Sequence, residues 1–137
     1  MDVLLFSAVA DNIKKEINHK CGLNLSQTRL LLYFAENDNS PLTMGRLAEG
    51  LNISLSTLSR QLQQARTKSY IEIVRSEKDS SKNVKLNEAG INKVKELQGF
   101  LIQIESNLFS SLTKHELSSF TKELEKVVEY SNAMELA

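Results

Sequence analysis

The 137-residue chain has one cysteine, one proline, no tryptophan and no excess charge of either sign. A single cysteine, Cys21, excludes an intrachain disulfide framework and a zinc site built only from cysteines. No run of 18 apolar residues occurs, so no transmembrane helix and no membrane partner are predicted. The N-terminus lacks a basic segment ahead of its apolar part, which argues against a signal peptide. We therefore expect a single domain, 1–137, in the cytoplasm.

Charge is balanced in total but uneven along the chain. The protein has 17 Lys and Arg residues against 17 Asp and Glu, whereas residues 43–85 hold eight basic and four acidic side chains. A basic centre within a neutral protein is typical of a localised surface that binds phosphate groups.

The segment 42–75 predicts a helix-turn-helix followed by a strand. Its first helix carries apolar side chains at helical spacing, the turn is Asn52-Ile53, and Ser54 is placed to cap the second helix. The second helix has an apolar stripe that we expect to face the core, formed by Leu55, Leu58, Leu62 and Ala65.

The opposite face of this second helix is short and polar. It carries Ser56, Thr57, Arg60 and Gln64, with Gln61 and Gln63 on its flanks. Arg pairs with guanine, Gln with adenine, and Ser or Thr with several base edges. The pattern predicts a recognition helix in a DNA major groove. A helix of this kind in a protein that binds no DNA is the alternative.

The residues after this helix predict a β-hairpin. Residues 70–75 alternate as a strand, residues 76–83 are polar and turn-like, and residues 84–86 return as the partner strand. This order is a winged helix, so the predicted fold class is mainly α with a small β-hairpin wing.

Helices are predicted on both sides of the winged helix. They span 2–19, ended by Gly22 as a left-handed cap, then 24–35, about 87–112, and a last helix that begins with a capping box at Thr113 and Glu116. A helix of about 25 residues is near 37 Å long, more than a small domain covers. We therefore expect a homodimer, with 23–86 as the winged helix-turn-helix and 1–22 and 87–137 as dimerisation helices.

The chain resembles the MarR family of bacterial transcriptional regulators over nearly its whole length. The matching stretches are Leu25-Ser26-Gln27, Leu42-Thr43 with Leu47-Ala48, Ile53 to Arg60, Tyr70-Ile71-Glu72 with Arg75-Ser76, and Leu86-Asn87-Glu88-Ala89-Gly90. The resemblance implies a homodimer that binds a pseudo-palindromic operator, usually as a repressor released by a small-molecule effector or an oxidant.

Two positions depart from the family pattern. The wing usually has an Asp-x-Arg whose Arg reaches the minor groove, whereas Ser81 stands there in this chain. Lys78 or Lys82 could substitute, although Lys lacks the planar fork of Arg. The Gly usual before the wing strand is Ser69, which would cost up to about 1 kcal/mol if that position needed a positive φ.

Other candidate sites are weaker. Cys21 could be a redox sensor, but no second cysteine resolves a sulfenate and a helix C-terminus raises a thiol pKa. His19, Cys21 and His115 match no metal-ligand spacing, so no metal is expected. Tyr33 and Phe34 could line an effector pocket or belong to the core. No enzyme motif occurs, so neither catalysis nor a cofactor is expected.

These features together predict a homodimeric regulator of transcription whose partner is double-stranded DNA. The residues expected at base edges are Ser56, Thr57, Arg60, Gln61 and Gln64. Those expected at the DNA backbone or in the wing are Arg46, Ser54, Arg75, Lys78 and Lys82. The alternative is a winged-helix protein-interaction module with little DNA affinity, which the altered wing and the zero net charge favour.

Overall fold

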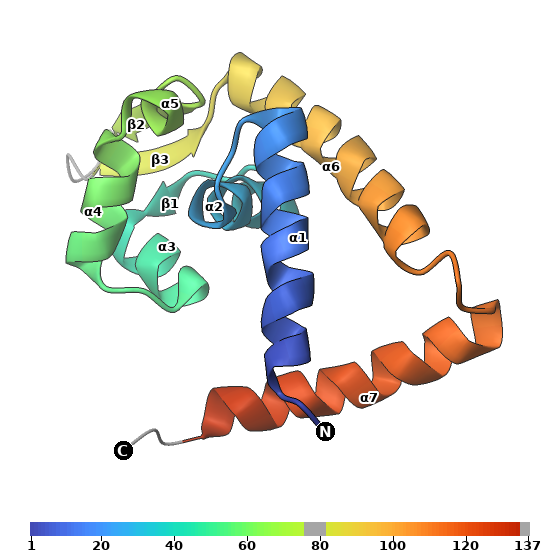
Figure 1. Cartoon of the computed structure of the whole chain (residues 1–137). Coiled ribbons are helices and arrows are strands. Elements are labelled where there is room, and N and C mark those ends of the chain that lie inside the picture. The colour runs from blue at the N-terminus through green and yellow to red at the C-terminus, as the bar shows by residue number, and fades with distance from the viewer. Residues whose placement is uncertain (76–81, 135–137) are drawn as a thin grey trace. The chain divides into compact units, whose positions relative to one another are not determined.

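The computed structural model describes residues 1–75 and 82–134. Its elements are α1 (Leu4–Cys21), α2 (Leu25–Glu36), β1 (Leu42–Thr43), α3 (Met44–Leu51), α4 (Leu55–Gln63), α5 (Ala65–Lys68), β2 (Ile71–Arg75), β3 (Lys82–Leu86), α6 (Glu88–Leu108) and α7 (Lys114–Ala133) (Figure 1). The chain forms two compact units, Met1–Leu101 and Ile102–Ala137. The predicted fold class is confirmed.

The sheet of the first unit has three strands rather than the two that the sequence predicted. The strand order is β1-β3-β2, and both pairs are antiparallel. In the hairpin, Ile71 pairs with Leu86 and Arg75 with Lys82. The added strand β1 is only two residues long, at positions that we had assigned to the start of a helix, and such a short strand leaves no periodic signal.

The core of the first unit lies where the helices meet this sheet. Helix α2 contacts α3 and β3, and α3 also contacts α4. The apolar side chains that are almost fully buried come from every layer: Ile17, Leu23, Leu30, Leu31, Phe34, Leu47, Leu58, Leu86 and Leu97. Phe34, which the sequence left open between pocket and core, belongs to the core with no exposed surface.

Local side chains and left-handed residues cap the helix ends, and the Gly22 and Ser54 caps are those that the sequence predicted. Gly22 ends α1 with φ 68°, and Asn24 caps α2 in a capping box with Gln27. Ser54 caps α4, where its hydroxyl accepts the Thr57 N–H, and Asn52 in the turn adopts the left-handed conformation. These caps depend on residues three or four positions apart, so the sequence alone contains them.

The start of α6 explains the Leu86 to Gly90 motif. The Asn87 side chain accepts the Gly90 N–H at 2.8 Å and donates to the Ser69 carbonyl at 3.0 Å. A Cβ at Gly90 would lie 2.2 Å from the Tyr70 carbonyl oxygen, so only glycine allows this approach. Ser69 has φ −66°, so this position does not need a positive φ and the cost that would follow from one does not arise.

The second unit consists of the end of α6 and α7. α6 stops at Leu108, four residues before the predicted end. The predicted capping box of Thr113 and Glu116 is confirmed, and the rings of Phe109 and Phe120 pack at a tilt of 52° with 5.8 Å between their centroids. No residue of α7 is buried in the single chain.

Candidate nucleic-acid interface

The N-terminus of α4 is held by a small hydroxyl cluster. The Ser54 hydroxyl accepts the Thr57 N–H at 3.1 Å, donates to Thr57 Oγ1 at 2.9 Å, and lies 3.1 Å from the Ser56 hydroxyl. Leu58 and Leu62 anchor the other side of the helix in the core. The helix is therefore fixed at its start and along its inner face, which holds the outer face in a defined orientation.

The outer face of α4 presents hydrogen-bonding groups without a negative charge. Ser56 and Arg60 are exposed, whereas Thr57 and Gln61 are half-buried. Arg60 Nη2 is 3.4 Å from Thr57 Oγ1, so the guanidinium lies along the helix and keeps other donors free. No Asp or Glu occurs between Glu49 and Glu72. Such a face attracts phosphate and can read base edges.

The C-terminal end of α4 differs from the prediction. The helix ends at Gln63, because Gln64 has an extended backbone with ψ 133° and a separate short helix, α5, follows. The Gln64 Oε1 accepts from Gln27 Nε2 at 3.4 Å. Gln64 therefore does not continue the outward row of α4, and Ala65 does not continue its apolar stripe, so the predicted positions of both residues were wrong.

Leu55 also departs from its predicted position. The sequence placed it in the apolar stripe, but 57% of its surface is exposed. It is the first residue of α4, one turn ahead of Leu58, where the core no longer lies beneath the helix. Periodicity gives the direction of a side chain but not whether anything covers it.

The candidate phosphate contacts lie on neighbouring elements. Arg46 is exposed in the first turn of α3, whose cap is Thr43. Arg75 and Lys82 are exposed and stand opposite each other where the described part of the hairpin ends. Glu72 pairs with Lys85 at 3.8 Å, which offsets its negative charge on the hairpin. Lys78 and Ser81 lie outside the described residues.

A groove that the sequence did not reveal runs between α4 and the sheet. Its volume is about 660 Å³, and its lining is mostly apolar, with Met44, Leu62, Ile71, Ile73 and Val84, beside the cations Lys68 and Lys82. Ile73 is 59% exposed. The alternation of residues 71–75 predicted the strand, but only the packing of the sheet against α4 forms the groove.

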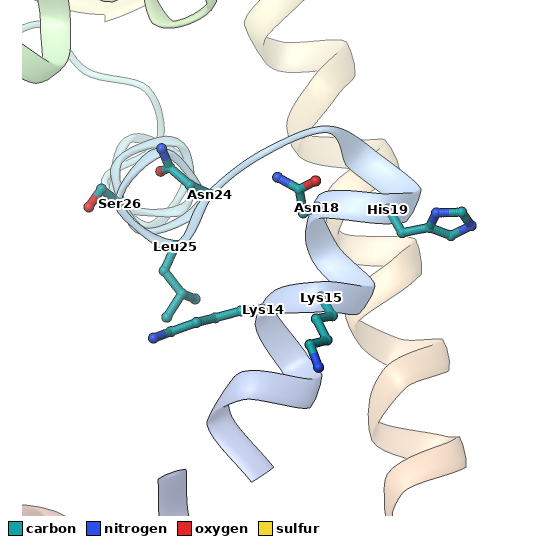
Figure 2. A pocket seen from close by; sticks show the side chains of 7 residues that line it. All are labelled: Lys14, Lys15, Asn18, His19, Asn24, Leu25 and Ser26. Atoms are coloured by element: carbon teal, nitrogen blue, oxygen red, sulfur yellow. The ribbon is translucent and has the colours of Figure 1, made fainter. Parts of the chain in front are cut away.

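A second hollow lies between α1 and the start of α2 (Figure 2). Its lining includes three basic side chains, Lys14, Lys15 and His19, together with Asn24 and Ser26. Figure 2 shows Lys14 reaching toward Leu25, whereas Lys15 and His19 point away from α2. Because the basic groups do not converge, this hollow is an open polar surface rather than a formed anion site.

The weaker candidates occupy structural positions. Cys21 is buried, and burial raises the pKa of its thiol; Lys93 partly opposes this effect and Glu96 adds to it. A protonated thiol is a poor redox sensor. Tyr33 is half-buried, with its hydroxyl over Gly50, where a Cβ would collide with it. Within residues 1–75 and 82–134, no group of three or more His, Cys, Asp or Glu side chains could hold a metal.

None of the helices within residues 1–75 and 82–134 combines the length and the apolar character that crossing a membrane requires.

Comparison with known proteins gives one family and one fold. Residues 22–80 match the sequence profile of the MarR family. The structure resembles the S. aureus MepR–DNA complex with a TM-score of 0.77 and 22% identity, covering 95% of this chain and 96% of that one. It also resembles a mutant MarR from E. coli complexed with operator DNA, with a TM-score of 0.74, 19% identity and coverage of 93% and 99%. A third similar structure is that of the heme sensor protein PefR from Streptococcus agalactiae in complex with heme. The TM-score is 0.69 and the identity is 20%, covering 93% of this chain and 88% of that one. No curated protein matches the sequence.

Proposed function

We propose that the chain is a winged-helix protein of the MarR family, whose model matches residues 22–80, and that it regulates transcription by binding double-stranded DNA as a homodimer. Two structural neighbours were solved with DNA, which supports this role. The family also agrees with the expectation that the protein is not an enzyme. We expect it to act in the cytoplasm, where it would meet DNA.

The observation that carries the proposal is the exposed, acid-free polar face of α4. We assign base reading to Ser56, Thr57, Arg60 and Gln61, which share this face. Arg60 is the strongest candidate because its guanidinium can pair with both acceptors of a guanine. Gln64 is left out of this set because it lies beyond the end of the helix, next to Gln27.

Phosphate contacts would come from the elements around α4. We assign them to Arg46 at the start of α3 and to Arg75 and Lys82 on the hairpin, all of them exposed. Ser54, at the N-terminus of α4, completes the set, because helix N-termini favour phosphate. These contacts would place the protein on the duplex without reading its sequence.

The homodimer is supported by apolar surface that a single chain leaves open. At the start of α1, Val3, Leu4 and Leu5 are each more than half exposed. In the second unit, Ile102 and Tyr130 are more than half exposed, and Val127 and Val128 about half. Apolar helix faces of this kind mark protein–protein contacts. A second copy would cover them and present two recognition helices to a pseudo-palindromic operator, about 10 base pairs apart.

Regulation by a ligand extends the proposal. PefR, a neighbour of the same fold, is a heme sensor solved with heme, which supports a response to a small-molecule effector. We propose that binding represses the genes beside the operator and that an effector releases the protein from DNA. A reporter gene placed behind the selected operator would test the direction of regulation.

The decisive test is selection of binding sites from a random pool of double-stranded DNA at two salt concentrations. An inverted repeat with half-sites about one helical turn apart is the expected product. Affinity should fall steeply as salt rises, because phosphate contacts release counterions. Failure to enrich any sequence at low salt, both without additions and with cell extract to supply a ligand that an activator would need for binding, would instead favour a protein-interaction module.

A further inference from the structure

Arg66, on the short helix α5, is bound to the corner between α1 and α2. This corner comprises residues 21–27, and its Gly22 ends α1 in the left-handed conformation with φ 68°. Arg66 Nη1 donates a hydrogen bond to the Gly22 carbonyl oxygen. The C-terminal end of a helix carries partial negative charge and unpaired carbonyls, so a guanidinium is well suited to this position.

A second, buried contact joins the same corner to α5. Gln27 is 8% exposed and Thr67 is 2% exposed, and Gln27 Nε2 lies 3.4 Å from Thr67 Oγ1. The same amide is 3.4 Å from Gln64 Oε1, while Gln27 Oε1 accepts the Asn24 N–H at 3.0 Å. Buried polar groups are costly when they lose their partners, so this arrangement favours one placement of α5 against α2.

α5 follows the recognition helix directly after the break at Gln64. Only Gln64 separates α5 from α4, and its backbone bonds to both helices: its N–H donates to the Gln61 carbonyl at 3.3 Å and its carbonyl accepts the Lys68 N–H at 2.9 Å. Whatever fixes α5 therefore also fixes the C-terminal end of α4. The Ser54 cap holds the N-terminal end, so α4 is held at both ends.

We infer that Arg66 and Gln27 are positioning residues, which hold the end of the recognition helix against the corner between α1 and α2 and so set how its outer face meets DNA. The inference rests on the proposed role of α4 in reading DNA. Gln27 is too deeply buried to touch a duplex, and the Arg66 guanidinium is engaged by a carbonyl. Their effect on DNA recognition passes through the orientation of α4.

This role predicts a loss of sequence discrimination rather than of general affinity. A recognition helix that shifts at one end loses base contacts, which need defined geometry, whereas phosphate contacts tolerate small shifts. A phosphate-binding Arg would behave in the opposite way. Its loss would weaken binding to every sequence and reduce the slope of log affinity against log salt by about one. The two roles of Arg66 are therefore separable by experiment.

The test compares the full-length protein with Arg66→Ala and Thr67→Val. Thr67→Val removes the hydroxyl partner of Gln27 and leaves the α2 capping box intact. Each protein is titrated against the selected operator and a scrambled duplex over a series of salt concentrations. Both variants should lower the ratio of specific to non-specific affinity roughly two- to thirtyfold, the range of couplings carried through packed elements. The salt slope and the scrambled-duplex affinity should stay unchanged.

Arg29→Ala is the matched control, since Arg29 is an exposed cation on α2 outside the corner. It should leave the ratio unchanged. If Arg66→Ala lost affinity equally for the operator and the scrambled duplex, and its salt slope fell by about one, Arg66 would be a phosphate contact and its positioning role would be overturned. An unchanged ratio in both variants would overturn the inference as a whole.

Amide hydrogen exchange gives a readout that does not need DNA. The Lys68, Ser69 and Tyr70 N–H groups bond within α5 and its cap at 2.9, 3.2 and 3.0 Å. If the corner holds α5, these amides should exchange several-fold faster in both variants, whereas amides of α6 should not change. Unchanged exchange would overturn the inference even if the wild type bound DNA. Faster exchange in a protein that bound no DNA would refute the proposed function and leave the hold on α5 intact.

Discussion

Two amphipathic helices, α4 and α7, leave opposite kinds of surface exposed. α4 buries Leu58 and Leu62 almost completely and presents Ser56 and Arg60 to solvent. α7 buries no residue at all, and its Phe120, Val127, Val128 and Tyr130 are between 44% and 73% exposed. Both helices have two chemically different faces, but only α4 is covered on its apolar side.

The difference shows what kind of partner each helix lacks. The surface left open on α4 is polar, basic and free of acids, which suits a polyanion. The surface left open on α7 is apolar, and its exposure to water costs free energy. Another apolar protein surface would suit it as a partner. One chain thus has two incomplete faces, and we propose that DNA covers one and a second copy covers the other.

Val127→Glu should have the largest effect on function. A carboxylate buried in the proposed dimer face would prevent association, and because Glu is a better helix former than Val, the substitution should not destabilise α7 itself. Loss of the dimer turns a two-site contact with the operator into a one-site contact, so operator affinity should fall roughly a hundredfold or more. Sedimentation equilibrium and operator titration measure the two effects.

Lys126→Ala is the control on the same helix, because Lys126 and Glu123 are both over 70% exposed and form a surface pair at 3.7 Å. Surface ion pairs of this kind contribute little free energy to stability, so this variant should remain a dimer. A Val127→Glu protein that stayed dimeric with full affinity would show that α7 is not the dimer face.

Arg60→Ala tests the other face. It should cost about 1–3 kcal/mol at one base pair of each half-site and relax specificity there, because the bidentate pair with guanine is lost. Arg60→Lys should restore little of this specificity, since Lys keeps the positive charge but lacks the planar fork that binds both guanine acceptors. Titration against operators with single-base changes measures both variants. Recovery of affinity by Lys on all sequences would make Arg60 a phosphate contact.

The sequence predicted best what depends on near neighbours. The left-handed Gly22, the capping box of Thr113 and the Ser54 cap each involve residues within four positions. The helix period also predicted the buried Leu58 and Leu62, and with them which face of α4 would be polar.

What the sequence did not predict depends on contacts across the fold. The break at Gln64 lies beside Gln27, 37 residues away, and β1 exists only because Leu42 pairs with Val84. Leu55 follows the apolar period but projects beyond the core, and Ser69 needs no positive φ in this fold. Periodicity and propensity contain no information on which distant segment reaches a given residue.

Lys82→Ala should have a smaller effect than Arg60→Ala and a different signature. If Lys82 contacts a phosphate, its loss should weaken binding to all sequences alike and reduce the slope of log affinity against log salt by about one. Lys85→Ala is the control from the same strand, because Lys85 already pairs with Glu72 at 3.8 Å. An unchanged slope for Lys82→Ala would remove the hairpin from the proposed contact surface.

Cys21→Ala should have the smallest effect on DNA binding and a definite signature in stability. Because burial raises the pKa of the folded thiol above its ordinary value of 9.0, the unfolded chain loses this proton first as the pH rises. The stability of the wild type relative to Cys21→Ala should therefore be constant below about pH 8 and fall as the pH passes 9.0. Denaturant unfolding of both proteins between pH 7 and about pH 10 measures the difference, in which other groups cancel. A wild type that instead gained stability over this range would have a stabilised thiolate, and Cys21 would return as a redox sensor.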